Sequence, residues 1–256
     1  MILHSKVIGN GNGIPFLILH GFLGMGDNWK SIALRLSRMG YQIHLIDQRN
    51  HGRSFHSQNF SYESMANDLK MYCDHHKLKD IILLGHSMGG KTAMLFAALN
   101  PDSVIKLIIA DIAPRFYPIH HQQILEGLSK LDFNLIDSRK KADIELSKHV
   151  DDFVVRQFLL KNLYWVCPGV LGLRLNLKIL MENVNEIGES LPSNLTVNTE
   201  TLFLKGDRSE YISDKDINLI GNQFEKFSVK TIPNSGHWLH AENPEDFFTE
   251  ILNFLN

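Results

Sequence analysis

The sequence predicts an α/β fold in which a mostly parallel, twisted sheet is covered by helices on both faces. Two observations indicate this fold: short apolar runs alternate with amphipathic segments, and the runs are apolar at nearly every position. Strands with such uniform runs are buried on both faces, as in a parallel sheet. The predicted strands cover residues 16–19, 42–46, 81–84, 104–110, 201–204 and 228–232.

The segments between these runs are expected to form helices, because their apolar residues recur at helical spacing. Pro244 stands at a first-turn position of the last segment, and Asn243 precedes it as a cap. The predicted helices cover residues 28–39, 62–76, 88–99 and 244–255. Residues 1–8 are expected to add an antiparallel edge hairpin, with the glycine-rich residues 9–13 as its turn.

One long stretch interrupts the alternation of strands and helices. Residues 115–193 contain no convincing strand and are expected to form four helices, over residues 119–130, 138–149, 152–162 and 173–187. The predicted organisation is therefore one α/β core, formed by residues 1–114 and 194–256, with a helical cap inserted between its strands. A peripheral helical decoration is the alternative interpretation of the same stretch.

Composition narrows the class of protein. The 256 residues carry a formal net charge of −2 with both signs interspersed, so nucleic acid is not an expected partner. Two cysteines are too few for a disulfide framework, and no signal peptide or membrane-spanning run is apparent. A cytoplasmic location without an integral membrane segment is expected, while the oligomeric state is left open.

The strongest functional motif is G-x-S-x-G, formed by residues 85–89. An apolar strand precedes it and a helix follows it, which is the context of a nucleophile elbow. The tight turn leaves no room for side chains at Gly85 and Gly89, and it exposes Ser87 beside a helix N-terminus that favours negative charge. The motif predicts that Ser87 is a nucleophile.

An oxyanion hole requires backbone N–H donors near that serine. Residues 20–24, with the sequence HGFLG, follow the strand at 16–19 and lie where such a donor is needed. The predicted donors are the N–H groups of Phe22 and Met88. His20 is interpreted as a residue that shapes this loop.

The general base is predicted to be His237, in the loop between the last strand and the last helix. That loop reaches the strand ends near the elbow. His240 is a weaker competitor because it lies nearer the helix. Surface positions are expected for the remaining candidates His75, His76, His120, His121 and His149.

The acid that orients the base has two candidates. Asp111 directly follows the strand at 104–110, and Asp207 follows the strand at 201–204. Both loops lie at the edge of the sheet where the elbow is expected. The order of the elements alone does not choose between them.

Four stretches carry a resemblance to a known family: HGFLG with DNW at 20–29, DQRNHGRS at 47–54, GHSMGGK at 85–91 and DIAP at 111–114. Together they resemble the α/β-hydrolase superfamily over nearly the whole chain, and more narrowly the YbfF-type bacterial acyl esterases and their mitochondrial relatives in animals. The resemblance implies an α/β-hydrolase fold and the hydrolysis of acyl esters, with fatty acyl esters or acyl-CoA as substrates.

The resemblance also bears on the acid. Many superfamily members carry it at the position of Ser209, whereas YbfF-type esterases have serine there and draw the acid from the DIAP loop. Asp111 is therefore favoured and Asp207 is the alternative. Ser209 is expected near His237 as an auxiliary hydrogen-bonding group. Trp238 is a candidate for the acyl pocket, with a packing role as the alternative.

The predicted function is a serine esterase or thioesterase that works through an acyl-enzyme on a small-molecule acyl substrate. No cofactor or metal is expected. A carbon–carbon bond hydrolase of the same fold is one alternative, but no polar cluster for its substrate's carboxylate is apparent. A noncatalytic ligand-binding protein is another, although such proteins typically lose a member of the triad. A haloalkane dehalogenase would need aspartate in place of Ser87.

Overall fold

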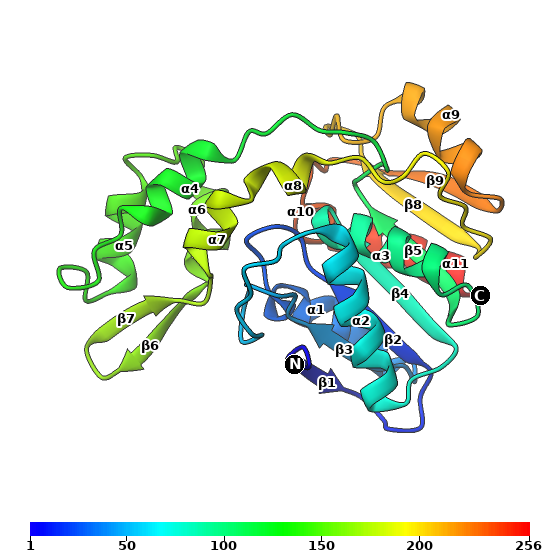
Figure 1. Ribbon diagram of the computed structural model, residues 1–256, viewed down its shortest axis with the longest axis horizontal. Helices are drawn as coiled ribbons and strands as arrows, with labels where there is room; N and C mark the ends of the chain where they lie inside the picture. The colour runs from blue at the N-terminus through cyan, green and yellow to red at the C-terminus, as the bar shows by residue number, and fades with distance from the viewer.

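The computed structural model describes residues 1–256 and contains a seven-stranded sheet in the order β1-β3-β2-β4-β5-β8-β9 (Figure 1). All neighbouring strands from β3 to β9 pair in parallel, which confirms the predicted fold class. The strands of this sheet are β1 (Ser5–Ile8), β2 (Pro15–Leu19), β3 (Gln42–Ile46), β4 (Ile81–His86), β5 (Val104–Ala110), β8 (Thr201–Gly206) and β9 (Phe227–Ile232).

Helices cover both faces of the sheet because alternate strand residues point to opposite sides. Phe16 and Ile18 of β2 belong to the smaller core, which they share with α1 (Lys30–Arg38) and α11 (Pro244–Leu255). Leu17 and Leu19 belong to the larger core. The helices that pack there are α2 (Tyr62–His76), α3 (Met88–Leu99) and α9 (Asp214–Gln223).

The expectation of an N-terminal hairpin is wrong, because β1 does not pair with the strand that follows it in the chain. β1 is an antiparallel edge strand, but it pairs with β3, with Ser5 opposite Ile46 and Ile8 opposite Ile43. Both edges of β2 are occupied by β3 and β4, so the following strand offers no free edge to β1. Residues 9–13 form the crossing connection, in which Gly9 has φ +105°.

Residues 115–193, the cap segment, lie beside the core at one end of the molecule (Figure 1). Their helices are α4 (Gln122–Ser129), α5 (Arg139–Leu146), α6 (Phe153–Leu160), α7 (Leu177–Glu182) and α8 (Val184–Gly188). The helices α9 and α10 (Leu239–Glu242) of the core were not predicted from the sequence, and the helix expected over residues 28–39 begins as the short helix η1 (Gly26–Trp29).

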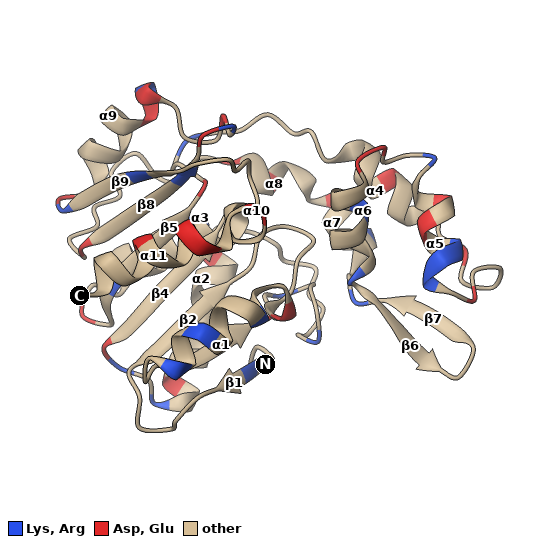
Figure 2. Ribbon diagram, turned by 180° about the vertical axis from the view of Figure 1, so that it is seen from behind, with Lys and Arg blue, Asp and Glu red and all other residues tan.

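The expectation that the cap segment holds only helices is wrong. An antiparallel hairpin forms between β6 (Leu163–Cys167) and β7 (Val170–Leu173), so the helix expected over 173–187 starts later and divides into α7 and α8. Tyr164, Trp165 and Val166 favour a strand, and Gly169 takes the turn with φ +84°. The hairpin carries no charged residue (Figure 2).

Polar contacts tie the cap segment to the core. Asn162 Nδ2 donates to the carbonyl of Leu23 at 2.8 Å, and Lys91 Nζ donates to the carbonyls of Gly188 and Glu189. Burial is the main cause that lowers the pKa of Lys91 to about 7. Separately, no helix in the structure combines the length and the apolar character needed to cross a membrane.

Candidate active site

Ser87 stands alone between β4, which ends at His86, and α3, which begins at Met88. Its backbone has φ 53° and ψ −120°, a conformation that a non-glycine residue rarely adopts. The Ser87 N–H donates to the carbonyl of Ala110 at 3.0 Å, which fixes the turn. These features are those of a strained strand–turn–helix elbow that exposes the serine.

Gly85 and Gly89 of the motif have to be glycines because neighbouring backbone atoms leave no room for a side chain. A Cβ on Gly85 would lie 2.2 Å from the carbonyl oxygen of Gly89, and a Cβ on Gly89 would lie 2.5 Å from that of Leu19. Both obstacles are backbone atoms, which no rotamer change can move. The tight turn therefore leaves no room for a side chain at either glycine, as the sequence analysis expected.

His237 and Asp111 meet at the same end of the sheet. Asp111 follows β5 directly, is fully buried and has φ 51°. Nδ1 of His237 donates to Oδ2 of Asp111 at 2.8 Å. Ser87 and His237 line one cavity, so the structure brings the three predicted residues into a single site.

The Asp111 carboxylate has two further donors. The N–H of Gly206 donates to its Oδ1 at 3.2 Å, and the Ser209 hydroxyl donates to its Oδ2. Ser209 and His237 thus contact the same oxygen of Asp111, so Ser209 lies near His237 and makes its hydrogen bond to Asp111. Three hydrogen-bond donors to this buried carboxylate offset the cost of removing its oxygens from water.

Asp207, the alternative acid, has a different set of contacts. Its carboxylate accepts the N–H groups of Asn234 and Ser235, each at 2.9 Å. These two backbone hydrogen bonds are the main cause that lowers the pKa of Asp207. Asp207 thus orders the start of the loop that carries His237, and its carboxylate makes no hydrogen bond to the imidazole.

The two predicted oxyanion donors belong to residues close to Ser87: Phe22 lines the same cavity as Ser87, and Met88 follows Ser87 in the chain. Phe22 N–H takes part in no hydrogen bond within the protein. Met88 N–H is in the first turn of α3, where a helix offers no internal acceptor. Gly21 packs closely against the elbow, since a Cβ there would lie 2.8 Å from Nδ1 of His86.

Two buried histidines shape the loop that carries Phe22. The Gln48 N–H donates to Nε2 of His20 at 3.0 Å, and the Leu23 N–H donates to Nε2 of His51 at 3.2 Å. Burial lowers the pKa of His20 to about 4 and that of His51 to about 3, so both rings are neutral and able to accept. His20 has the structural role that the sequence analysis favoured.

His86, the variable residue before the nucleophile, was missed by the sequence analysis. Its Nε2 donates to the backbone carbonyl of His237 at 2.8 Å. Burial holds the pKa of His86 well below its usual value, so the ring is a neutral donor. The elbow therefore anchors the loop of His237 as well as supplying Ser87.

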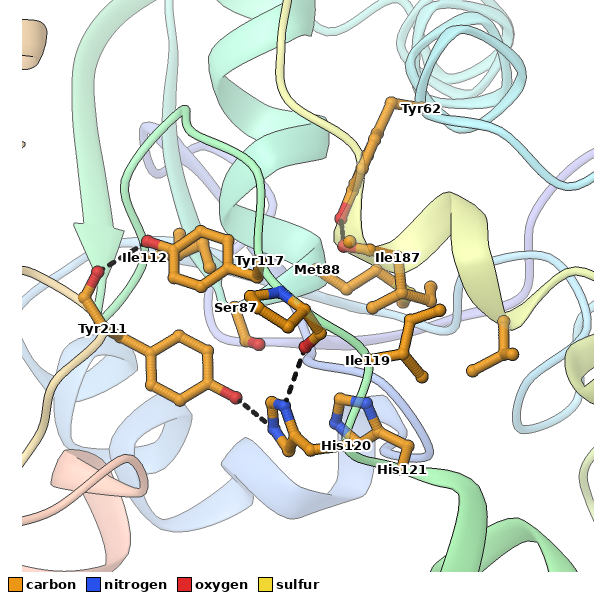
Figure 3. Close-up of a pocket in the computed structure, with 13 residues that line it drawn as sticks. Tyr62, Ser87, Met88, Ile112, Tyr117, Ile119, His120, His121, Ile187 and Tyr211 are labelled. Atoms are coloured by element: carbon orange, nitrogen blue, oxygen red, sulfur yellow. Dashed lines mark hydrogen bonds between the residues drawn. The ribbon is translucent and has the colours of Figure 1, made fainter.

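Two cavities meet at Ser87 and His121. One has a volume of about 340 Å³ and is lined by apolar residues such as Ile112 and Ile187 (Figure 3). The other has a volume of about 420 Å³, contains His237 and Trp238, and extends under Val155, Phe158 and Leu159 of the cap segment.

The expected surface position of His121 is wrong. The cap segment carries it into both cavities, where its ring lies 5.1 Å from that of Phe22. Burial lowers the pKa of His121 to about 3, so the ring is neutral. Its sequence context, between polar residues at a helix start, gave no signal of this placement.

No group of three or more His, Cys, Asp or Glu side chains in the structure could hold a metal ion. The chemistry available at the site is that of a hydroxyl, an imidazole–carboxylate pair and backbone donors. Such a set can activate a serine toward a carbonyl carbon.

Fold and site together define an α/β-hydrolase. A sequence-family model described as "alpha/beta hydrolase fold" matches residues 14–137. The sn-1-specific diacylglycerol lipase ABHD11 of Danio rerio is 36% identical over 96% of this chain and 80% of its own length. The chain belongs to the α/β-hydrolase superfamily.

Narrower comparisons agree with the predicted family. Esterase YbfF of Escherichia coli is 31% identical over 96% of this chain and 94% of its own length. A solved structure named "Marine microorganism esterase" is 42% identical, with a TM-score of 0.95 and 99% of each chain covered. The resemblance to YbfF-type esterases is confirmed, and these relatives support a hydrolase that acts on carboxylic esters.

Proposed function

We propose that the chain is a serine esterase that cleaves acyl esters through Ser87, His237 and Asp111 and a covalent acyl-enzyme. The observation that carries the proposal is the hydrogen bond between His237 Nδ1 and Asp111 Oδ2 in the cavity that Ser87 enters. That bond leaves Nε2 of His237 as the basic nitrogen. It also stabilises the imidazolium that forms during the reaction.

In the first step the Ser87 hydroxyl oxygen bonds to the acyl carbon while its proton passes to His237. The carbonyl oxygen becomes an oxyanion, which the N–H groups of Phe22 and Met88 stabilise. Cleavage of the bond between the acyl carbon and the leaving oxygen regenerates the carbonyl. The alcohol departs with the proton from His237.

In the second step water attacks the acyl carbon of the acyl-enzyme. His237 accepts a proton from this water, and the same oxyanion donors act again. The bond from the acyl carbon to Ser87 then breaks, and His237 returns the proton to the serine oxygen. The products are a carboxylic acid and the free enzyme.

The lining of both cavities supports an apolar ester as substrate. The smaller cavity has 8 hydrophobic residues among 13, and the larger has 7 among 12. No lysine or arginine lines either one, so the phosphates of an acyl-CoA would have no cation inside them. We therefore favour an ester of a fatty acid with an uncharged alcohol over a thioester of coenzyme A.

The same lining argues against the rival functions. A carbon–carbon bond hydrolase has to bind a carboxylate, and neither cavity offers a lysine or arginine for one. A noncatalytic ligand-binding role does not account for the contact between His237 and Asp111 or for the strained backbone of Ser87. Acyl ester hydrolysis uses all of these features.

The cap segment is proposed to form the roof of the site. It supplies Ile119 to the smaller cavity, Val155 and Phe158 to the larger one, and His121 to both. The division into a core of residues 1–114 and 194–256 and a cap of residues 115–193 follows from this role. The cytoplasmic location remains a prediction.

The first test is turnover of p-nitrophenyl esters from acetate to palmitate, with Ser87→Ala as the matched control. Turnover that disappears in Ser87→Ala, together with loss of fluorophosphonate labelling, is expected. The chain-length profile then measures the acyl pocket. A folded wild-type protein that cleaves none of these esters and is not labelled would overturn the proposal.

A further inference from the structure

Tyr211 lies against the face of the proposed base. It belongs to the loop between β8 and α9, and its ring is stacked on that of His237, with centroids 3.8 Å apart and planes inclined by 17°. Asp111 contacts the imidazole edge at Nδ1. Asp111 therefore holds one edge of the imidazole ring, and Tyr211 covers one of its faces.

The ring of Tyr211 is itself held in place. Its hydroxyl donates to Nε2 of His120 at 2.8 Å, and His120 Nδ1 donates to the carbonyl of Pro118 at 3.1 Å (Figure 3). The carbonyl of Tyr211 accepts the Tyr117 hydroxyl at 2.5 Å. Contacts on both its hydroxyl and its backbone thus fix Tyr211.

The loop of Tyr211 serves the same histidine–aspartate pair twice. The Tyr211 N–H donates to the Ser209 hydroxyl at 3.3 Å, and that hydroxyl donates to Asp111. Ser209 thus supports the carboxylate, while Tyr211 covers the imidazole that the carboxylate orients. The two residues are separated by one position in the chain.

We propose that Tyr211 is a positioning residue for His237 and that His120 of the cap segment tethers it. The stack limits rotation of the imidazole between Asp111 and Ser87, and the face of the tyrosine ring favours the positive charge that His237 acquires. This inference rests on the proposed esterase function. It adds a physical connection between the position of the cap and the orientation of the base.

The contact can first be tested in the wild-type protein. Stacking at this distance predicts an upfield ring-current shift of the carbon-bound ring protons of His237 in the NMR spectrum. The shift should remain in Tyr211→Phe and disappear in Tyr211→Leu. Ordinary histidine positions for these protons in the wild type would overturn the inference without bearing on the esterase proposal.

Steady-state kinetics test whether the stack of Tyr211 on His237 contributes to turnover. With p-nitrophenyl acetate, whose acyl group is too short to probe the pocket, Tyr211→Leu should lower kcat on the order of 10- to 100-fold, with KM within about twofold. Tyr211→Phe keeps the ring but loses the hydrogen bond to His120, so its kcat should fall by only about two- to fivefold. Tyr164→Leu, a matched change on the β6–β7 hairpin, should leave both parameters unchanged.

The tether is tested by a double-mutant cycle. His120→Ala and Tyr211→Phe each remove the same hydrogen bond, so the double variant should be no slower than the slower single variant. Additive losses would contradict the tether. A kcat for Tyr211→Leu within twofold of wild type, or an equal loss in Tyr211→Phe, would overturn the positioning role. Turnover that survives Ser87→Ala would instead overturn the esterase proposal.

Discussion

Nδ1 of His237 and Oδ2 of Asp111 lie 2.8 Å apart although 126 positions separate the two residues in the chain. The carboxyl ends of the parallel strands β5 and β9 lie at one edge of the sheet and bring them together. Asp111 is fully buried, and its left-handed backbone conformation turns the chain sharply after β5. The carboxylate is thereby aimed at the imidazole edge.

Replacing Asp111 by Asn should lower kcat by on the order of 10³- to 10⁴-fold, because an amide can favour the wrong tautomer of His237. The side chain stays the same size, so the melting temperature should change little by comparison. Steady-state turnover of p-nitrophenyl butyrate and thermal unfolding measure the two effects separately. Turnover close to that of wild type would show that Asp111 is not the acid.

Asp207→Asn is the paired experiment. The Asp207 carboxylate accepts two backbone N–H groups and makes no hydrogen bond to the imidazole, so kcat should fall by less than about tenfold. The change removes a charge that these hydrogen bonds stabilise, so unfolding should occur at a lower temperature. A larger loss of kcat than in Asp111→Asn would reverse the assignment of the acid.

Ser209→Ala removes the hydroxyl that donates to Asp111 Oδ2. The carboxylate keeps Gly206 N–H and His237 as donors, so the loss should be worth about 1 kcal/mol, or roughly fivefold in kcat. Ser209→Thr retains a hydroxyl and serves as the control. Equal turnover in all three proteins would mean that this hydrogen bond does not help to orient the base.

Gly85→Ala and Gly90→Ala should differ in severity. The Cβ on Gly85 meets the backbone oxygen of Gly89 at 2.2 Å, whereas the Cβ on Gly90 meets the side-chain Cγ2 of Ile112 at 2.4 Å. The elbow backbone cannot move, whereas the buried, β-branched Ile112 can shift or change its rotamer at some cost, so Gly85→Ala should cost more than about 3 kcal/mol and Gly90→Ala about 1 to 3 kcal/mol. Urea unfolding monitored by circular dichroism measures both, and the reverse order would contradict this account.

The core could be predicted from the sequence because its strands are buried on both faces and read as uniform apolar runs. Ser87 and His237 could be assigned because each follows a strand at a recognisable place in the chain order. The choice between Asp111 and Asp207 depended on family resemblance, since both aspartates follow strands that end at the same edge. Only the geometry shows which carboxylate contacts the imidazole.

The residues that were missed act through contacts that no local pattern records. His86 and Tyr211 contact His237, and His121 shares two cavities with Ser87, because of how segments distant in the sequence pack. The hairpin β6–β7 was missed for another reason. It lies almost wholly between the helices expected over residues 152–162 and 173–187, and its strands of five and four residues are too short for a clear pattern of their own.

His240 allows a test of how buried histidines set the acid stability of this protein. Its ring is stacked on Trp29 with centroids 3.8 Å apart, and its Nδ1 is buried without a hydrogen-bond partner. Burial, followed by the nearby His237 and Lys161, lowers the pKa of His240 to about 3. Below pH 6.5 His240 therefore binds a proton in the unfolded chain but stays neutral in the folded protein. The free energy of unfolding consequently decreases as the pH falls from 6.5 toward 3.

His240→Phe keeps an aromatic ring against Trp29 and removes both the unpartnered nitrogen and the proton linkage. The variant should be more stable than wild type, and its advantage should grow from pH 8 to pH 5 by up to about 2 kcal/mol. Urea unfolding at the two pH values measures this difference, with His75→Gln at the exposed end of α2 as a control that should show no such growth. An advantage of equal size at both pH values would mean that the imidazole of His240 takes up its proton in the folded protein as readily as in the unfolded chain.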